Sequence, residues 1–149
     1  MLPKIHIITG IFFVTLIYLL FPSISKIGLV IVLLSSILID SDHMIYYFLR
    51  TKNLSLRKAL QWYGINMNKT LALPMSERKK RYTGFYIFHG IEMLVITLLL
   101  GVFVSKIFIF VFLGFSFHML LDVPHEFIVK RTFHKFSLIY SYFQFKKLG

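Results

Sequence analysis

One apolar stretch of the chain, from Tyr82 to Val123, is too long to form a single membrane helix. At 1.5 Å per residue it would extend about 60 Å, which is twice the thickness of the hydrocarbon core of a bilayer. A polar break, Ser105-Lys106, follows shortly after Gly101. We therefore expect two membrane helices here, over residues 82–104 and 107–123, joined by a tight turn.

Two further apolar segments, over residues 5–21 and 27–49, are also long enough to cross a bilayer. The chain is 57% hydrophobic and only 15% charged, whereas soluble domains are about 45–50% apolar and about 25% charged. A soluble fold of this length could not bury so many apolar side chains. The sequence thus predicts an all-α membrane protein, a single integral membrane domain built as a four-helix transmembrane bundle. A cleaved signal peptide is disfavoured, because no A-x-A-like site follows the first segment.

Basic residues lie mostly on one side of the predicted spans. Fifteen of them fall before the first span, in the loop 50–81 or in the tail 124–149, and two fall in the outer turns. The positive-inside rule then predicts a multi-pass protein of the cell (inner) membrane with both termini in the cytoplasm. The net charge of +11 suits anionic lipid headgroups, and no motif indicates binding to nucleic acid. The oligomeric state is not indicated.

Two stretches outside the spans mix basic and aromatic residues. They run from Leu54 to Gly64 in the loop and from His134 to Lys147 in the tail. Such a mixture is typical of amphipathic helices that lie in the membrane interface. We expect both to anchor the chain to the membrane surface.

Acidic and histidine side chains recur at one depth in the predicted spans. Counted inward from the nearest cytoplasmic basic residue, they lie seven to twelve positions along the second, third and fourth spans, a depth of about 10–18 Å. They are Asp40, Asp42, His43, His89, Glu92, His118 and Asp122, and His6 opens the first span on the same side. Four separate segments therefore bring ionisable groups to nearly one level.

The spacing within each span also brings these groups to one helical face. Asp40 and His43 are three residues apart, as are His89 and Glu92, and His118 and Asp122 are four apart. Asp42 projects from another face of its helix. We expect Asp42 to support the site or to face the substrate.

Carboxylates in a membrane need compensation for their lost hydration. An aspartate at the centre of a membrane helix costs about 2.5–3.5 kcal/mol on insertion scales. A divalent cation would offset that cost, and histidine nitrogens with carboxylate oxygens suit zinc, iron or manganese. The sequence predicts a divalent metal site, with zinc as the expected ion, manganese or iron as alternatives, and room for two ions. A metal-free polar network is the main alternative, whereas a transport pathway is disfavoured because the outer halves of the spans lack polar residues.

The motif DSDH, from Asp40 to His43, resembles the D-x-D-H motif of the YdjM-like membrane-bound metal-dependent hydrolases. In that family an early histidine, matched here by His6, opens the N-terminal helix. A late histidine and aspartate on the last core helix are matched by HMLLD, from His118 to Asp122. Where the family typically has H-R-x-x-T-H-S, this chain has FHGIEML, so His89 matches and Glu92 replaces further histidine chemistry. The resemblance implies a helical hydrolase that is distantly similar to zinc-dependent phospholipase C enzymes.

These observations predict a metal-dependent hydrolase in the cytoplasmic leaflet that acts on a phosphoester or ester of a lipid or amphiphile. A bound metal would lower the pKa of its water from 15.7 to about 7. Glu92 or Asp42 is the expected general base or a ligand to a second metal. The expected metal ligands are His6, Asp40, His43, His89, His118 and Asp122. The alternative is a non-enzymatic membrane protein in which a structural metal or polar cluster ties the helices together.

Overall fold

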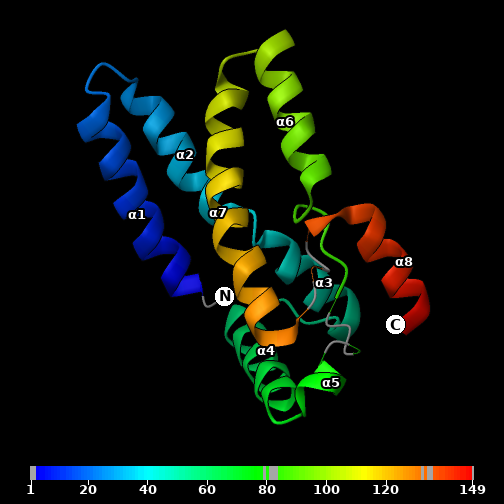
Figure 1. Cartoon of the computed structure of the whole chain (residues 1–149). Helices are drawn as coiled ribbons and strands as arrows, with labels where there is room; N and C mark the ends of the chain where they lie inside the picture. Colours follow the sequence, from blue (N-terminus) through cyan, green and yellow to red (C-terminus); the bar gives the residue numbers. More distant parts are fainter. Residues whose placement is uncertain (1–2, 79, 81–83, 132, 134–135, 149) are drawn as a thin grey trace.

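The computed structural model describes residues 3–78, 80, 84–131, 133 and 136–148, and its regular structure there is entirely helical. At one end of the molecule (Figure 1), α1 (Pro3–Leu20), α2 (Lys26–Leu38), α6 (Ile91–Phe103) and the first half of α7 (Ile107–Lys130) lie together. Toward the other end lie α3 (Ser41–Thr51), α4 (Leu56–Leu71), the short α5 (Met75–Arg78) and α8 (Leu138–Leu148). The chain therefore has an all-helical fold over the described residues, as the sequence predicts.

Two helical stretches are long and apolar enough to cross a membrane. One is α7, and the other is the run Lys26–Thr51, which contains α2 and α3. The apolar helices α1 and α6 are shorter, and α6 with 13 residues is about 20 Å long. A bundle of four membrane spans stays a prediction.

The second predicted span is interrupted at Asp40, so the expected continuous helix over 27–49 is wrong at this point. α2 ends at Leu38 and α3 begins at Ser41. The hydroxyls of Ser35 and Ser36 donate to backbone carbonyls of the preceding turn, at 2.7 Å and 2.8 Å. Such bonds compete with the helix ladder and bend helices. The break places Asp40 between the two helices.

The third helix begins later than hydropathy predicts. Residues 84–90 are non-helical and α6 starts only at Ile91, whereas the predicted helix starts at Tyr82, which lies outside the described residues. Gly84 adopts a φ of +157°, which side-chain-bearing residues rarely adopt, and Gly90 is extended. The turn to α7 lies at residues 104–106, the position predicted from Ser105-Lys106.

The fourth helix continues through Pro124 to Lys130, so the predicted end of this helix at Val123 is wrong. A proline inside a helix removes one backbone hydrogen bond and costs about 3 kcal/mol or more. The added turns are held by burial of Glu126 and Lys130, whose side chains approach to 3.6 Å, and by contacts with α5. Tertiary packing here outweighs the local preference of proline.

The helices α2 and α7 form the most extensive contact between elements. At Gly114 their backbones approach so closely that an added Cβ atom would lie 2.5 Å from the Val32 oxygen and 2.9 Å from the Ser36 nitrogen. At Gly28 the ring of Phe110 fills the space of a side chain. Small residues at helix crossings are typical of membrane proteins, because they let backbones approach. This crossing fixes the position of α7 relative to Asp40.

The two predicted surface stretches both contain helices. Residues 56–64 of the first stretch form the first part of α4, and the tail contains α8. His134 and Lys135 lie outside the described residues, as do Lys79 and Arg81 of the basic loop. Exposed apolar side chains on both helices, such as Leu60 and Phe143, suit the membrane interface.

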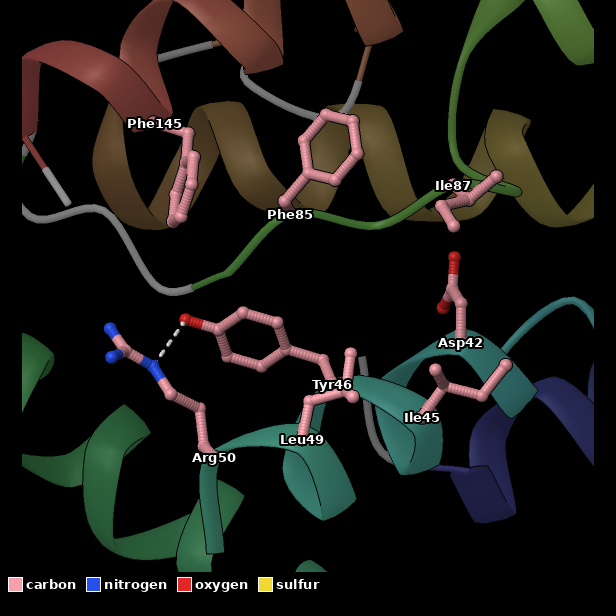
Figure 2. A pocket seen from close by; sticks show the side chains of 8 residues that line it. All are labelled: Asp42, Ile45, Tyr46, Leu49, Arg50, Phe85, Ile87 and Phe145. Carbon is pink, nitrogen blue, oxygen red and sulfur yellow. Dashed lines mark hydrogen bonds between the residues drawn. The ribbon is translucent and has the colours of Figure 1, made fainter.

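A groove runs along α3 on the side that faces α8 (Figure 2), with a volume of about 290 Å³. Its walls come from α3, from the non-helical segment before α6 and from α8. The lining residues are Asp42, Ile45, Tyr46, Leu49, Arg50, Phe85, Ile87 and Phe145.

Candidate metal centre

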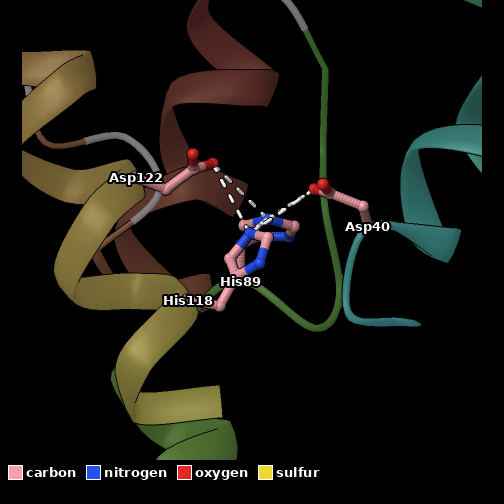
Figure 3. A group of neighbouring side chains, drawn as sticks. All are labelled: Asp40, His89, His118 and Asp122. Carbon is pink, nitrogen blue, oxygen red and sulfur yellow. Dashed lines mark hydrogen bonds and ion pairs between the residues drawn. The ribbon is translucent and has the colours of Figure 1, made fainter. Parts of the chain in front are cut away.

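Four ionisable side chains from three parts of the chain converge on one point (Figure 3). The Nε2 atoms of His89 and His118 are 3.2 Å apart, and each lies within 3.4–3.5 Å of Asp40 Oδ1. Asp122 Oδ2 lies 3.7 Å from the His89 Nε2 atom and 3.8 Å from that of His118. These four residues form a group that could hold a metal ion.

The fold places each member of this group by a different local feature. His118 and Asp122 lie one turn apart on α7, so both side chains project from one helical face. Asp40 occupies the break between α2 and α3, and His89 lies in the non-helical segment before α6. His89, His118 and Asp122 are fully buried, while Asp40 is 18% exposed.

The outer nitrogens of the two histidines fix their tautomers. His118 Nδ1 lies 2.8 Å from the carbonyl oxygen of Ser36, which can only accept, so Nδ1 carries the proton and donates. His89 Nδ1 likewise donates to Asp42 Oδ2 at 3.0 Å. When the two histidines are neutral, both Nε2 atoms direct lone pairs toward the centre. Histidines that bind metals usually donate their other ring N–H to a carboxylate or carbonyl in this way.

The chemistry and spacing of the group fit a metal ion. With neutral histidines, two nitrogen lone pairs and two carboxylate oxygens point toward one centre, and such a set of ligand atoms suits a divalent cation. A tetrahedral zinc ion with bonds of about 2.0–2.2 Å holds its ligand atoms about 3.3–3.6 Å apart. The five separations that involve a histidine, 3.2–3.8 Å, bracket this range, and all four ligand atoms lie within 4.8 Å of one another. The identity of the metal does not follow from these distances.

His6 and His43 flank the four-residue group. His6 Nε2 lies 3.1 Å from Asp122 Oδ1, and its ring stacks on that of His118 with centroids 4.0 Å apart. His43 Nε2 lies 3.6 Å from Asp40 Oδ1. All six predicted metal ligands thus gather in one place. Binding of two ions stays a prediction: a second possible group comprises Asp42, His43 and His89, and it shares His89 with the first.

Asp42 binds the ring nitrogen of His89 that points away from the centre. Its Oδ2 atom accepts both the His89 Nδ1 proton and the backbone N–H of Phe88, at 3.0 Å and 2.9 Å. Its Oδ1 atom lies 3.3 Å from His43 Nδ1. The carboxylate therefore orients two histidines at once, which agrees with the supporting role that its helical face predicts.

Exchange of Asp42 for asparagine tests this support. The amide keeps the size of the side chain but loses the charge that holds the His89 Nδ1 proton. We expect Asp42→Asn to weaken metal affinity about 10–100-fold, as is usual for loss of a hydrogen-bond partner behind a metal ligand. Competition with a chromogenic chelator measures this affinity. Unchanged affinity would show that Asp42 does not orient His89 for binding.

Glu92 lies away from the converging groups. Its helical pairing with His89 is wrong, because His89 precedes the helix, whose N-cap is Gly90. The carboxylate instead accepts bonds from Ser137 Oγ and the backbone N–H groups of Leu138 and Ile139, at 2.6, 2.8 and 3.3 Å. Glu92 thereby caps the first turn of α8.

The change Glu92→Gln should distinguish a role in the metal site from a role as the cap of α8. We expect unchanged metal content and faster amide hydrogen exchange in α8, because the amide is a weaker cap, by about 0.5–2 kcal/mol. Metal analysis and hydrogen exchange read by mass spectrometry provide the two measurements. A loss of metal without a change in α8 would instead place Glu92 in the site.

Aromatic residues next to the site could not be recognised from the sequence. The ring of Tyr86 lies 4.0 Å from that of His43, and Tyr63 on α4 donates its hydroxyl proton to the His43 carbonyl at 2.8 Å. Burial, together with nearby Tyr86, raises the pKa of Tyr63, so the phenol is a neutral donor. Neither tyrosine belongs to a recognisable sequence motif, and tyrosines are common near a membrane surface.

Comparison of the chain with protein-family models, with curated proteins and with solved structures finds no match. The resemblance to the YdjM-like hydrolases therefore stays a prediction from short motifs. What is shown is a helical chain with two membrane-compatible helices and a buried aspartate–histidine group that could hold a metal ion.

Proposed function

We propose that this chain is a multi-pass membrane protein that uses a divalent metal, most simply zinc, to hydrolyse a phosphoester or ester of an amphiphile. The observation that carries the proposal is the convergence of His89 and His118 Nε2 with the carboxylates of Asp40 and Asp122. Intramembrane ionisable residues mark functional sites by default, because their burial is costly. The family resemblance of DSDH and HMLLD supports the same reaction class.

The proposed topology puts this centre in the cytoplasmic leaflet of the cell membrane, with both chain termini in the cytoplasm. Support comes from the fifteen basic residues expected on that side against two on the other. Anionic headgroups are then the immediate surroundings of the loop and tail.

The centre is accessible from one side. The side chains of Asp40 and His43 are 18% and 22% exposed, whereas those of His6, His89 and Asp122 are at most 2% exposed. A substrate and water would therefore approach past Asp40 and His43. When bound, a divalent metal lowers the pKa of a coordinated water and polarises the oxygen of an ester or phosphoryl group.

The residues of this chain have distinct tasks in the proposed reaction. His89 and His118 present lone pairs held in place by Asp42 and the Ser36 carbonyl. His43, at the exposed edge, is positioned to take a proton from water and pass it to the leaving group, since imidazole exchanges protons near neutral pH. Asp42, which lies 3.3 Å from His43 Nδ1, stabilises the imidazolium that would form.

A structural metal site is the second candidate. Asp40, His89, His118 and Asp122 supply four ligands, which is a complete set for tetrahedral zinc, and closed sites of this kind are structural. In that case the ion would tie α7 to the α2–α3 break and to the segment before α6.

Activity and coordination can be tested together. The purified chain in lipid nanodiscs is supplied with zinc or cobalt, and release of phosphate or fatty acid from phospholipid mixtures is measured with and without chelator. We expect metal-dependent turnover, lost in His43→Gln at unchanged metal content. Cobalt absorption bands that shift on addition of azide would show an exchangeable position. Bound metal with no turnover and no azide response would favour the structural candidate.

A further inference from the structure

The groove along α3 joins apolar walls to a single exposed cation. Ile45 and Leu49 line its floor on α3, and Ile87 lines the opposite wall. These three side chains are 46%, 59% and 50% exposed, although they face a concave surface. Covering them with an apolar group would be favourable.

Arg50 marks the outer end of this groove (Figure 2). Its Nε atom donates to Tyr46 Oη at 3.2 Å, and its guanidinium lies 5.8 Å from the centre of that ring. Tyr46 thus holds the side chain in place, while no carboxylate among the described residues pairs with it. The terminal nitrogens of such an arginine suit a phosphate, which guanidinium groups bind with two parallel hydrogen bonds.

The inner end of the groove needs no polar group from an occupant. Asp42 closes it: its Oδ2 atom is already bound by Phe88 N and His89 Nδ1, and its Oδ1 atom lies 3.3 Å from His43 Nδ1. From Asp42 to Arg50 the groove follows eight residues of helix, or about 12 Å. One leaflet of the hydrocarbon core is about 15 Å thick. The length thus suits a chain that begins at the headgroup level and runs inward.

We propose that this groove binds one acyl chain of an anionic phospholipid of the cytoplasmic leaflet, whose phosphate is held by Arg50. The charge of the arginine matches the anionic headgroup, and the apolar walls match the chain. None of the four converging residues Asp40, His89, His118 and Asp122 is among the lining residues of this groove. The proposal goes beyond the hydrolase function and does not rest on it, because the bound lipid is a ligand whether or not the centre is catalytic.

Native mass spectrometry of the full chain in detergent tests the proposal. Phosphatidylglycerol and phosphatidylcholine with identical acyl chains are titrated separately, and the dissociation constant of the first bound lipid is compared. We expect phosphatidylglycerol to bind about tenfold more tightly, because phosphatidylcholine carries the same phosphate but places its own choline cation near Arg50. Arg50→Gln should remove this preference. Arg57→Gln, the same change at an exposed position outside the groove, should keep it.

The acyl chain is tested with a variant that fills the groove. Ile45→Trp should weaken binding of both lipids at least several-fold, whereas Val102→Trp, at an exposed apolar position on α6, should not. If Arg50→Gln and Arg57→Gln lowered the preference for phosphatidylglycerol equally, the preference would come from general charge attraction, and the proposal would be overturned. Unchanged binding in Ile45→Trp would also overturn it. Metal content and turnover are measured on the same variants, so a failure of the hydrolase proposal is distinguishable from a failure of this one.

Discussion

Exchange of His118 for glutamine is expected to abolish metal binding by the purified protein. His118 is fully buried, and its Nε2 atom lies within 3.8 Å of the three other members of the group. Loss of one of four ligands should lower affinity by more than the 10–100-fold that loss of a supporting partner typically costs. For a site that holds one ion, the metal content measured by elemental analysis after gel filtration should fall from about one ion per chain to near zero.

A matched control is available on the same helix. His125→Gln is the same exchange, seven residues further along α7 and outside the converging group, so it should retain the metal. Circular dichroism of both variants establishes that the helices are intact. Metal retained in His118→Gln, or lost equally in His125→Gln, would contradict the site.

The second large effect is expected at the crossing of α2 and α7. We expect Gly114→Val to destabilise the fold by about 3 kcal/mol or more, the upper end of the usual cost of overpacking. The new side chain would meet Ser35 Oγ and the backbone of Val32 and Ser36, and backbone atoms cannot move aside as a flexible side chain can. The free energy of unfolding, measured by denaturant titration in detergent with chelator present, gives the size of the effect without a contribution from metal.

Gly64 on α4 supplies the control for this change. An added Cβ atom there meets nothing within 4 Å, so Gly64→Ala should stabilise the chain by about 0.5–1 kcal/mol through helix propensity. Gly114→Ala should also lower the free energy of unfolding, but by less than Gly114→Val, because only a Cβ atom is added. If both glycines tolerate alanine equally well, α2 and α7 do not cross as closely as the structure shows.

Helical spacing was sufficient to predict pairs that lie within one regular helix. His118 and Asp122 are four residues apart on α7 and meet at the centre as predicted. The common depth of Asp40, His89 and His118 was also visible, because they lie eight to twelve positions from basic residues that mark the membrane surface. Hydropathy and charge therefore located the centre without any knowledge of which helices pack together.

Errors arose where backbone geometry departs from a regular helix. The pairing of His89 with Glu92 assumed a helix from Tyr82, but the extended Gly90 separates the two side chains and turns Glu92 toward α8. The end of α7 was placed too early, at Val123, because the burial of Glu126 and Lys130, which hold the end of this helix, is a tertiary effect. His89, which Asp42 orients, is 47 positions away in sequence, and the His43 carbonyl that Tyr63 binds is 20 positions away, beyond the reach of any local pattern.

The length of α6 has a consequence for the surrounding membrane in the proposed topology. A helix of about 20 Å leaves about one third of an ordinary 30 Å hydrocarbon core unspanned. Lipids beside a short span adapt by local thinning of the bilayer, which draws headgroups and water toward Gly90 and the adjacent His89. The protein would thus shorten the path by which water, the co-substrate of any hydrolysis, reaches a centre set below the surface.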